Sequence, residues 1–245
     1  MIYIRKKPCS KKLRDSINSV KRLDDWKSAT DENTSLLRQC FDLLDKDEIK
    51  RTLIEEQHGI CAYCMARIKE DSMTIEHWQP LSKGKKYALD YKNFAGCCCG
   101  GRPKGSNNEL CCDAAKEDKA ITISPWNKEH MDKIKYTTEG RVVFDGENPE
   151  IFKDINYTLK LNGELDSEGN MLHDTWTRLV ENRRRQYRKF SEIMHRMNGN
   201  KYSQERIVAE LKKCIKNLES QEEYEEYVGV LLYFMRRKVG LTTSR

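Results

Sequence analysis

The sequence predicts an α+β protein, mostly helical, with a small metal-organised module near its middle. Seven of the ten cysteines fall within 52 residues, from Cys61 to Cys112, and the pattern up to Trp126 is short and irregular. In the last third, apolar residues recur at helical spacing. We expect four regions: a basic N-terminal arm over 1–34, the module with a leading helix over 35–128, a strand-and-loop connection over 129–175, and a helical region over 176–245.

The composition predicts a protein that is soluble in water. Mean hydropathy is −0.84, and 34% of the residues are charged. The longest apolar run, Tyr227 to Met235, has nine residues, far fewer than the ~20 that a helix needs to cross a bilayer. The first ten residues carry charge but precede no apolar stretch, so we expect neither a signal peptide nor a lipid anchor. The expected location is the cytoplasm, with no membrane partner.

The basic arm accounts for the net charge. The first 28 residues contain nine Lys and Arg against three Asp and Glu, an excess of six that equals the formal net charge of +6. Such a segment is typical either of a solvated or disordered tail or of a contact with nucleic acid or a partner. The sequence leaves both interpretations open.

A helix is predicted to lead into the cysteine module. Its apolar residues recur at helical spacing until Gly59; they are Leu36, Leu37, Cys40, Phe41, Leu44, Leu53 and Ile54. Further along we expect a short apolar strand at Met73 to Ile75, a glycine- and asparagine-rich insertion at 100–108, and a helix that opens at Asp113. In the connection, Arg141 to Phe144 is the one plausible strand.

Three amphipathic helices are predicted in the last third. The first starts near Trp176, and Ser203 is a good N-cap for the second. The third carries basic residues at its end and acidic residues in its opening turns, which suits the helix dipole. These acidic residues are Glu222, Glu223, Glu225 and Glu226. We expect the apolar stripes of all three helices to form core.

The cysteine cluster predicts a structural zinc site. In a reducing cytoplasm such a cluster is typical of metal ligation rather than disulfides. Cys61 and Cys64 have the two-residue gap that lets one turn present two sulfurs to a single ion. Four protein ligands leave no open position, so this zinc would hold the fold rather than catalyse. The other two thiolates must come from two later groups, which gives three times two, or six, choices. These groups are Cys97, Cys98 and Cys99, and Cys111 and Cys112.

Candidate catalytic residues lie between the two halves of the cysteine cluster. Glu76 and His77 end a short apolar segment, so we expect them at a strand end that faces an open groove. Asn93 follows sixteen residues later, and Asp113 comes directly after Cys112. A hard divalent cation prefers oxygen ligands, which Glu76 and Asp113 would supply, while His77 beside it can take a proton from water.

As a set, these residues resemble the HNH family of ββα-metal nucleases in its four-cysteine form. Within that family the chain most resembles the PtuB nucleases, the HNH subunits of Septu-type antiphage systems, some of which accompany retrons. The likeness covers about Gly59 to Trp126, roughly a quarter of the chain, and implies a zinc-stapled ββα-metal core. Its motifs are Cys61-x-x-Cys64, Glu76-His77-x-x-Pro80, Asn93 and Cys112-Asp113-x-x-Lys116.

The resemblance implies a one-metal hydrolysis of nucleic-acid phosphodiesters. His77 would be the general base, Glu76 a ligand of a catalytic Mg²⁺ or Mn²⁺, and Asn93 the residue that orients the histidine or its loop. Asp113 stands where many HNH proteins have His or Asn, and it would be the second ligand of the catalytic ion.

The zinc ligands of the second half are chosen by position. The insertion between these cysteines departs from the short knuckle that is usual in the family. We choose Cys98, five residues after Asn93, and Cys112, directly before the candidate metal ligand. With Cys61 and Cys64 they would form the structural zinc site.

The resemblance also implies partners. An ATPase of the PtuA type, which is ABC- or SMC-like, would restrain the nuclease or deliver it to substrate, and a retron reverse transcriptase with its RNA–DNA product is a further candidate. The substrate is DNA or RNA, tRNA included, because a site directed at phosphate reads neither base nor sugar. The alternative from another class is a noncatalytic four-cysteine zinc module that binds nucleic acid or protein. A redox role for the Cys-x-x-Cys pair would need a thioredoxin-like setting, which the pattern does not predict.

A basic stripe on the first C-terminal helix is a candidate nucleic-acid contact. At about 100° per residue its members point within about 40° of one another, opposite the apolar stripe; they are Arg178, Arg185, Lys189 and Arg196. Such a stripe can follow a phosphate backbone, and the plainer interpretation is an ordinary solvated face. Arg183 points with the apolar residues instead, so we expect it to pair with a buried acid or carbonyl.

Overall fold

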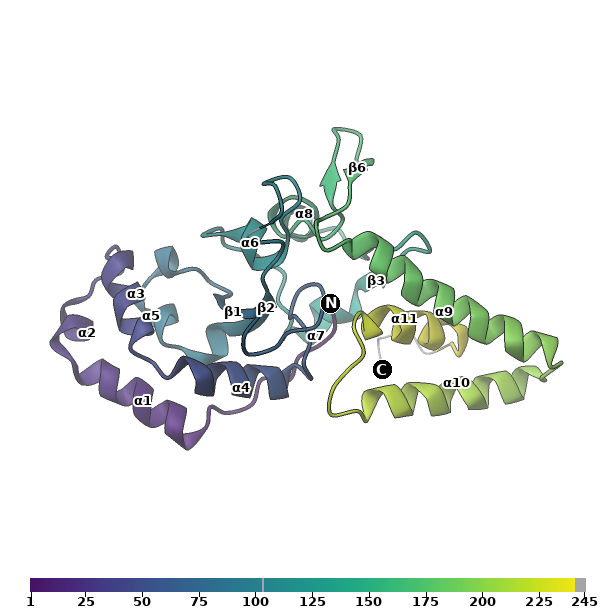
Figure 1. Cartoon of the computed structure of the whole chain (residues 1–245), viewed down its shortest axis with the longest axis horizontal. Helices are drawn as coiled ribbons and strands as arrows, with labels where there is room; N and C mark the ends of the chain where they lie inside the picture. The colour runs from purple at the N-terminus through teal and green to yellow at the C-terminus, as the bar shows by residue number, and fades with distance from the viewer. Residues whose placement is uncertain (103, 241–245) are drawn as a thin grey trace.

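The computed structural model describes residues 1–102 and 104–240 and confirms a mostly helical α+β fold. In this part of the chain the strands form three two-stranded antiparallel sheets. Figure 1 shows an elongated molecule with the N-terminal helices at one end, a small module of strands and helix in the middle, and three helices at the other end. Within the described residues, no helix combines the length and the apolar character needed to span a membrane.

The basic N-terminal arm packs against the rest of the molecule, so it is not a solvated or disordered tail. It contains α1 (Lys11–Arg22) and α2 (Asp24–Ser28). The apolar face of α1 is buried, and it consists of Leu13, Ile17 and Val20. The exposed lysines and arginines of the arm therefore lie on a folded surface.

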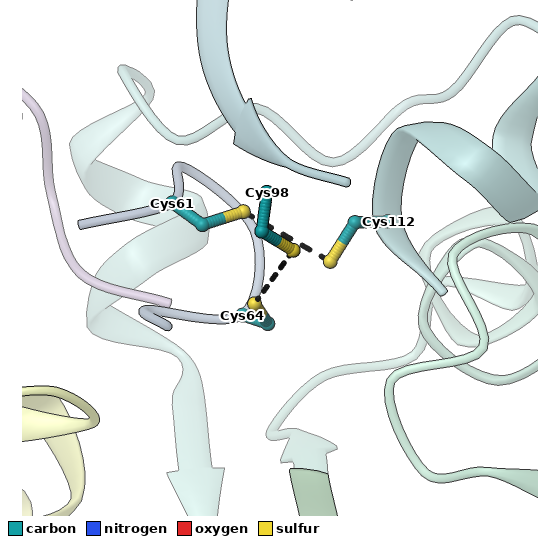
Figure 2. A group of neighbouring side chains, drawn as sticks. All are labelled: Cys61, Cys64, Cys98 and Cys112. Carbon is teal, nitrogen blue, oxygen red and sulfur yellow. Dashed lines mark hydrogen bonds between the residues drawn. The ribbon is translucent and has the colours of Figure 1, made fainter. Parts of the chain in front are cut away.

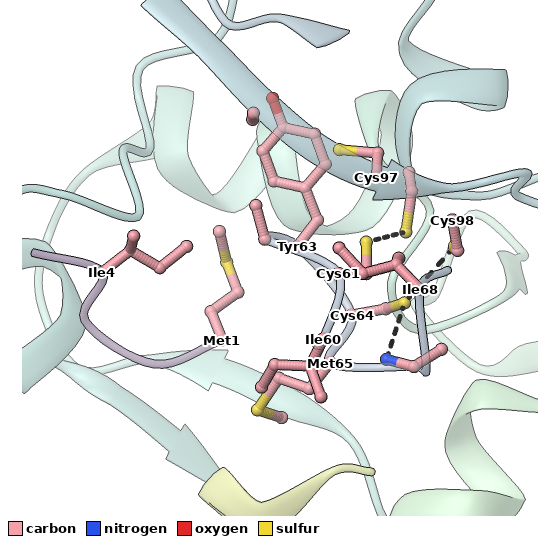
Figure 3. Packing of buried hydrophobic residues seen from close by; sticks show 14 of the residues in the cluster. Met1, Ile4, Ile60, Cys61, Tyr63, Cys64, Met65, Ile68, Cys97 and Cys98 are labelled. Carbon is pink, nitrogen blue, oxygen red and sulfur yellow. Dashed lines mark hydrogen bonds between the residues drawn. The ribbon is translucent and has the colours of Figure 1, made fainter. Parts of the chain in front are cut away.

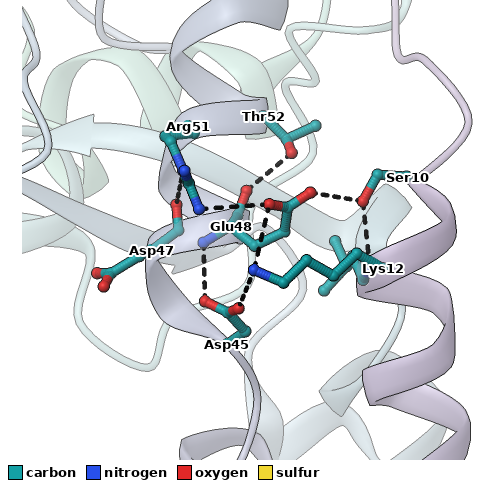
Figure 4. Close-up of polar contacts among 8 residues, drawn as sticks. Ser10, Lys12, Asp45, Asp47, Glu48, Arg51 and Thr52 are labelled. Atoms are coloured by element: carbon teal, nitrogen blue, oxygen red, sulfur yellow. Dashed lines mark hydrogen bonds and ion pairs between the residues drawn. The ribbon is translucent and has the colours of Figure 1, made fainter.

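Polar contacts join α1 to α4 (Lys46–Glu56) (Figure 4). The hydroxyl of Ser10 accepts from the N–H of Leu13 and so caps α1, and it donates to Glu48, 2.7 Å away. Lys12 forms an ion pair with Asp45, also at 2.7 Å. The start of the chain is thus held to α4 by both its apolar and its polar side chains.

The helix that was expected to lead into the cysteines is in fact two helices. α3 (Thr34–Asp42) ends at residue 42, and α4 starts after Asp45. The side chain of Asp45 accepts from the N–H of Glu48, and Asp is more favourable as an N-cap of this kind than in a helix interior. The apolar residues at helical spacing still face the core; those buried are Leu37, Cys40, Phe41, Leu44 and Leu53.

The middle module is built on one antiparallel hairpin followed by a short helix. β1 (Met73–His77) pairs with β2 (Phe94–Cys98) along its whole length. α6 (Cys112–Lys116) follows, so the helix opens one residue before the expected Asp113. The loop between the strands contains three short helical turns: η1 (Leu81–Lys83), α5 (Lys85–Ala88) and η2 (Tyr91–Asn93).

The connection is a series of small elements. The strand expected at Arg141 to Phe144 is present as β4, and its partner strand β3 was not predicted. The elements are α7 (Lys128–Asp132), β3 (Ile134–Tyr136), β4 (Val142–Phe144), α8 (Pro149–Lys153), η3 (Asp154–Thr158), β5 (Glu164–Leu165) and β6 (Met171–His173).

Three helices form the C-terminal region, as predicted: α9 (Leu179–Gly199), α10 (Gln204–Glu219) and α11 (Val228–Lys238). Ser203 caps α10, its side chain accepting from the N–H of Arg206. α9 starts later than expected because Arg178 has a φ of 52°, which no right-handed helix continues. The side chain of Trp176 consequently lies outside the helix and is exposed rather than core.

The acidic residues before α11 lie outside that helix, which corrects the dipole interpretation. Tyr227 has a φ of 58°, so α11 can begin only at Val228. The acidic residues contact basic side chains elsewhere instead: Glu223 lies 2.6 Å from Arg67, and Glu225 pairs with Lys189. Glu223 and Glu225 therefore make tertiary contacts and do not lie in the first turn of α11.

The segment before α11 is hydrogen-bonded to the turn that carries the first two cysteines. The N–H of Tyr224 donates to the carbonyl of His58 at 2.9 Å, and the N–H of Tyr227 donates to the carbonyl of Met65 at 3.0 Å. Arg67 donates to the carbonyl of Tyr224 at 2.6 Å. The C-terminal helices are therefore attached to both sides of the cysteine turn.

One apolar core runs through the cysteine module. Met1 and Ile4, from the start of the chain, pack beside Ile60 and Tyr63 (Figure 3). Buried residues of α9, α10 and α11 belong to the same cluster.

Arg183 lies in this interior and has the carbonyl partners that were predicted for it. Its Nε donates to the carbonyl of Gly140 at 2.7 Å, and its Nη2 donates to the carbonyl of Leu161. The guanidinium therefore joins α9 to the connection, although it is almost completely buried.

Candidate metal and catalytic site

Four buried cysteines lie close enough to bind one metal ion. The sulfurs of Cys61, Cys64, Cys98 and Cys112 all lie within 4.8 Å of one another (Figure 2). The Cys61–Cys112 sulfurs are 3.9 Å apart and the Cys64–Cys98 sulfurs 3.6 Å. Four sulfurs held about 2.3 Å from a tetrahedral zinc lie about 3.8 Å from one another. The donor set and its dimensions fit Zn²⁺, and these are the four cysteines that the sequence analysis selected.

Main-chain and side-chain hydrogen bonds bring the first cysteine turn to β2. Ala62 donates its N–H to the carbonyl of Gly96 at 3.0 Å. Gln57 holds the same residue from the end of α4: its Oε1 accepts from the N–H of Gly96 at 2.7 Å, and its Nε2 donates to the carbonyl at 2.8 Å. The turn is thereby docked two residues from Cys98.

A glycine turn brings in the fourth cysteine. The carbonyl of Gly100 accepts from the N–H of Cys111 at 3.0 Å, and this places Cys112 at the start of α6. Gly100 has a φ of +61°, and a Cβ there would lie 2.2 Å from the carbonyl oxygen of Cys111. Only glycine allows this approach, so the closure of the site depends on it.

The three remaining cysteines of the cluster are outside the four-sulfur group. Cys97 is buried on the opposite face of β2 from Cys98, since neighbouring strand residues alternate, and burial raises the pKa of its thiol well above the ordinary value. Cys99 is exposed, and the sulfur of Cys111 lies 3.7 Å from Thr177. In Cys61, burial opposes ionisation, but hydrogen bonds from neighbouring cysteines, Cys112 first, outweigh it and lower the pKa.

Three of the four predicted catalytic residues meet in a cleft beside the cysteine group. Glu76 and His77 at the end of β1 and Asp113 on α6 all line this cleft, whose volume is about 360 Å³. Asp113 is adjacent in sequence to Cys112, and Glu76 lies on the strand that pairs with the strand of Cys98. The cleft residues thus extend from the same hairpin and helix that carry Cys98 and Cys112.

Glu76 is buried and paired with a lysine that the sequence analysis did not assign. Its Oε1 lies 2.6 Å from the Nζ of Lys116, which is fully buried and also donates to the carbonyl of His77 at 3.1 Å. Burial raises the pKa of Glu76 to about 8; Lys116 opposes this rise, and the nearby carboxyl of Asp113 adds to it. The signal in the sequence was the position of Lys116, one helical turn after Asp113 on α6.

His77 is held in one orientation and is neutral at physiological pH. Its ring packs edge-on against Phe41 and Phe94, with centroids 4.5 and 5.0 Å away. The Nε2 lies 3.0 Å from the carbonyl of Ala88, which can only accept, so the proton is on Nε2 and Nδ1 keeps its lone pair. Burial lowers the pKa of His77 to about 4; the hydrogen bond that Nε2 donates to the carbonyl of Ala88 opposes this shift, and the charge of Arg38 adds to it.

Asn93 holds the loop between the strands and does not line the cleft. Its Oδ1 accepts from the N–H of Gln79 at 2.8 Å. Its Nδ2 donates to the carbonyls of Gln79 and Tyr87 at 2.8 and 3.0 Å. These bonds join the start and the end of the loop that carries Ala88, the partner of His77.

The predicted basic stripe is not a row of free charges. Arg178 precedes α9 and has a left-handed backbone, so the angular argument does not apply to it. Arg185 lies 3.6 Å from Glu181, and Lys189 pairs with Glu225, whereas Arg196 is exposed. α9 also lies on the far side of the cysteine module from β1 (Figure 1). The structure does not bring this stripe to the cleft.

The chain matches no protein-family model, and no curated protein is significantly similar to it in sequence.

Proposed function

We propose that the chain is a metal-dependent nuclease of the HNH type, with structural zinc at Cys61, Cys64, Cys98 and Cys112. The observation that carries this proposal is the cleft, in which a histidine and two carboxyl groups lie together on the hairpin and the helix that also carry Cys98 and Cys112. A noncatalytic zinc module has no need of such a cleft. The reaction would be hydrolysis of nucleic-acid phosphodiesters.

Two carboxylates in the cleft suit a hard divalent cation. Glu76 and Asp113 would hold Mg²⁺ or Mn²⁺, which prefer oxygen ligands. Burial is the main cause of the raised pKa of Glu76, and the nearby carboxyl of Asp113 adds to it; a cation bound by both carboxyl groups would favour their ionised forms. When bound, such an ion supplies positive charge for the phosphate and for the leaving oxygen.

The chain's own residues would position and activate the attacking water. His77, held by Ala88 through Nε2, would accept a proton from water at Nδ1 while the water oxygen forms a bond to phosphorus and the bond to the leaving oxygen breaks. Lys116 would hold Glu76 in place from the buried side. Asn93 would act on the histidine indirectly, through the loop that carries Ala88.

By its resemblance to PtuB, the nuclease would act in a Septu-type antiphage complex. An ATPase of the PtuA type would be the partner, with a retron reverse transcriptase and its RNA–DNA product as a further candidate, and the substrate would be DNA or RNA. The cleavage test uses purified full chain with Mg²⁺ or Mn²⁺, with and without the ATPase, on plasmid, phage DNA and total RNA.

His77→Gln is the informative variant, because alanine would leave a hole between two phenylalanine rings. It should reduce cutting by at least about a hundredfold, the usual contribution of a general base, with zinc content unchanged. His195→Ala, at an exposed position on α9, is the matched control and should cut like the wild type. Wild-type protein that binds nucleic acid but never cuts it under any of these conditions would favour the noncatalytic zinc module.

A further inference from the structure

Two arginines that the HNH resemblance does not assign line the cleft. They are Arg38, on α3, and Arg102, in the turn after β2. Their positions are 64 residues apart in the chain, so no local pattern connects them. Among the residues that line this cleft they are the only lysines or arginines, and the acidic ones are Glu76, Asp113, Glu117 and Asp118.

Arg102 is held beside the candidate metal ligand by the glycine turn. Its Nη1 lies 3.5 Å from the Oδ2 of Asp113, and its Nη2 donates to the carbonyl of Ala114 at 3.3 Å. The side chain is nevertheless 47% exposed. The hydrogen bond from the N–H of Cys111 to the carbonyl of Gly100 holds this turn against the start of α6, and Arg102 lies at the edge of the cleft.

Arg38 reaches the cleft beside the aromatic support of the histidine. Its guanidinium carbon lies 5.8 Å from the ring centroid of Phe41, and the same ring packs against His77. The side chain is exposed, and in the described part of the chain no carboxylate forms an ion pair with it. Its charge is therefore available to an anion that enters the cleft.

We propose that Arg38 and Arg102 bind phosphates of the strand that enters the cleft, and that Arg102 leaves Asp113 to do so. This inference rests on the proposed nuclease function. Four acidic side chains repel a polyanion at close range, so a nucleic acid needs positive charge at the same place. Guanidinium groups suit phosphate because they donate two parallel hydrogen bonds.

The ion pair of Arg102 gives this residue a second measurable property. In the structure its charge partly neutralises Asp113, which is the carboxylate that a divalent cation would bind. The cation and Arg102 would compete for the carboxylate of Asp113, so removal of Arg102 should tighten cation binding while it weakens nucleic-acid binding. Removal of Arg38, which has no such pair, should weaken nucleic-acid binding alone.

Nucleic-acid binding is measured by fluorescence anisotropy across a salt series, in a His77→Gln background. The probe is a fluorescein-labelled oligonucleotide, tested in three forms: single-stranded DNA, duplex DNA and single-stranded RNA. Arg38→Ala and Arg102→Ala should each weaken binding roughly tenfold and reduce the salt slope by about one. Arg237→Ala, at an exposed position on α11, is the control and should change neither. Mn²⁺ affinity, followed by electron paramagnetic resonance of the free ion, should rise severalfold in Arg102→Ala and stay unchanged in Arg38→Ala.

The outcomes separate this inference from the nuclease proposal. If the wild type cuts but both arginine variants bind like Arg237→Ala, the phosphate contacts are wrong and the nuclease stands. If the wild type never cuts but the arginine variants lose affinity, the contacts are right and the catalytic proposal fails. Unchanged Mn²⁺ affinity in Arg102→Ala would overturn the exchange at Asp113. Thermal unfolding of each variant checks that the exposed substitutions leave the fold intact.

Discussion

Replacing Gly100 by alanine should damage the four-cysteine group through the main chain. The added Cβ would lie 2.2 Å from the carbonyl oxygen of Cys111 and 2.7 Å from the Cβ of Ala114. An ordinary contact to that oxygen is about 3.2 Å, so the turn and α6 must separate by roughly 1 Å. The left-handed φ adds about 1–2 kcal/mol for a residue with a Cβ, and the clash adds about 1–3 kcal/mol.

The separation should weaken zinc binding by the four-cysteine group, because Cys98 and Cys112 lie on either side of this turn. Sulfur separations of 3.6 and 3.9 Å match a tetrahedral ion, and a displacement of roughly 1 Å would remove that match. We expect the free energy of unfolding to fall by about 2–5 kcal/mol, which for a chain of this size lowers Tm by on the order of 10 °C. Zinc that resists dialysis against EDTA in the wild type should be lost from Gly100→Ala.

Gly169→Ala is the matched control. Gly169 has a φ of +81°, but a Cβ there meets no atom within 4 Å. It should therefore cost only the conformational part, about 1–2 kcal/mol, and keep its zinc. Differential scanning calorimetry and elemental analysis after dialysis measure both quantities. Equal loss of stability and equal zinc retention in the two variants would refute the argument that the close approach at Gly100 closes the site.

Three further predictions concern single side chains. Cys112→Ser should release zinc to EDTA while Cys111→Ser retains it, and release from both would show that the site extends beyond four sulfurs. At a pH above 8, where Glu76 is ionised, Lys116→Met should lower the free energy of unfolding by about 3–5 kcal/mol, because it leaves the buried Glu76 without its cation; a loss below about 1 kcal/mol by urea titration at that pH would contradict this. Asn93→Ala should speed amide hydrogen exchange in the loop between β1 and β2, because it removes the side-chain hydrogen bonds that join the loop. It should also lower cutting without loss of zinc. Exchange rates in this variant equal to those of the wild type would exclude a role of Asn93 in holding the loop.

Local signals in the sequence predicted those features that depend on a few neighbouring residues. Ser203 was recognisable as an N-cap, Met73 to Ile75 as a strand, and Cys61 and Cys64 as a turn with two sulfurs. The direction of Arg183 followed from helical periodicity, and its carbonyl partners confirm it. In each case the physical cause lies within one or two turns of the chain.

Features that depend on distant contacts were missed or misjudged. The acidic residues before α11 were assigned to a helix dipole because the sequence around them does not reveal their partners. Arg67, which pairs with Glu223, lies 156 positions earlier in the chain. The break at Asp45 was hidden by apolar spacing that continues on both sides of it. Arg38 could not be placed at the cleft, since that requires knowing that α3 packs beside β1. Tertiary packing decides these positions, and a single sequence does not encode it in any local pattern.

The hydrogen bonds between the segment before α11 and the cysteine turn have a consequence for how the molecule comes apart. Tyr224 and Tyr227 are bonded to His58 and Met65, immediately outside the Cys61 to Cys64 turn. Loss of zinc would loosen the turn and remove the anchor of α10 and α11 in the same step, so chelation should melt helices that contain no ligand. By the same coupling, a chain shortened before Tyr224 would leave the turn without its outer bonds, and its cysteines would be open to oxidation.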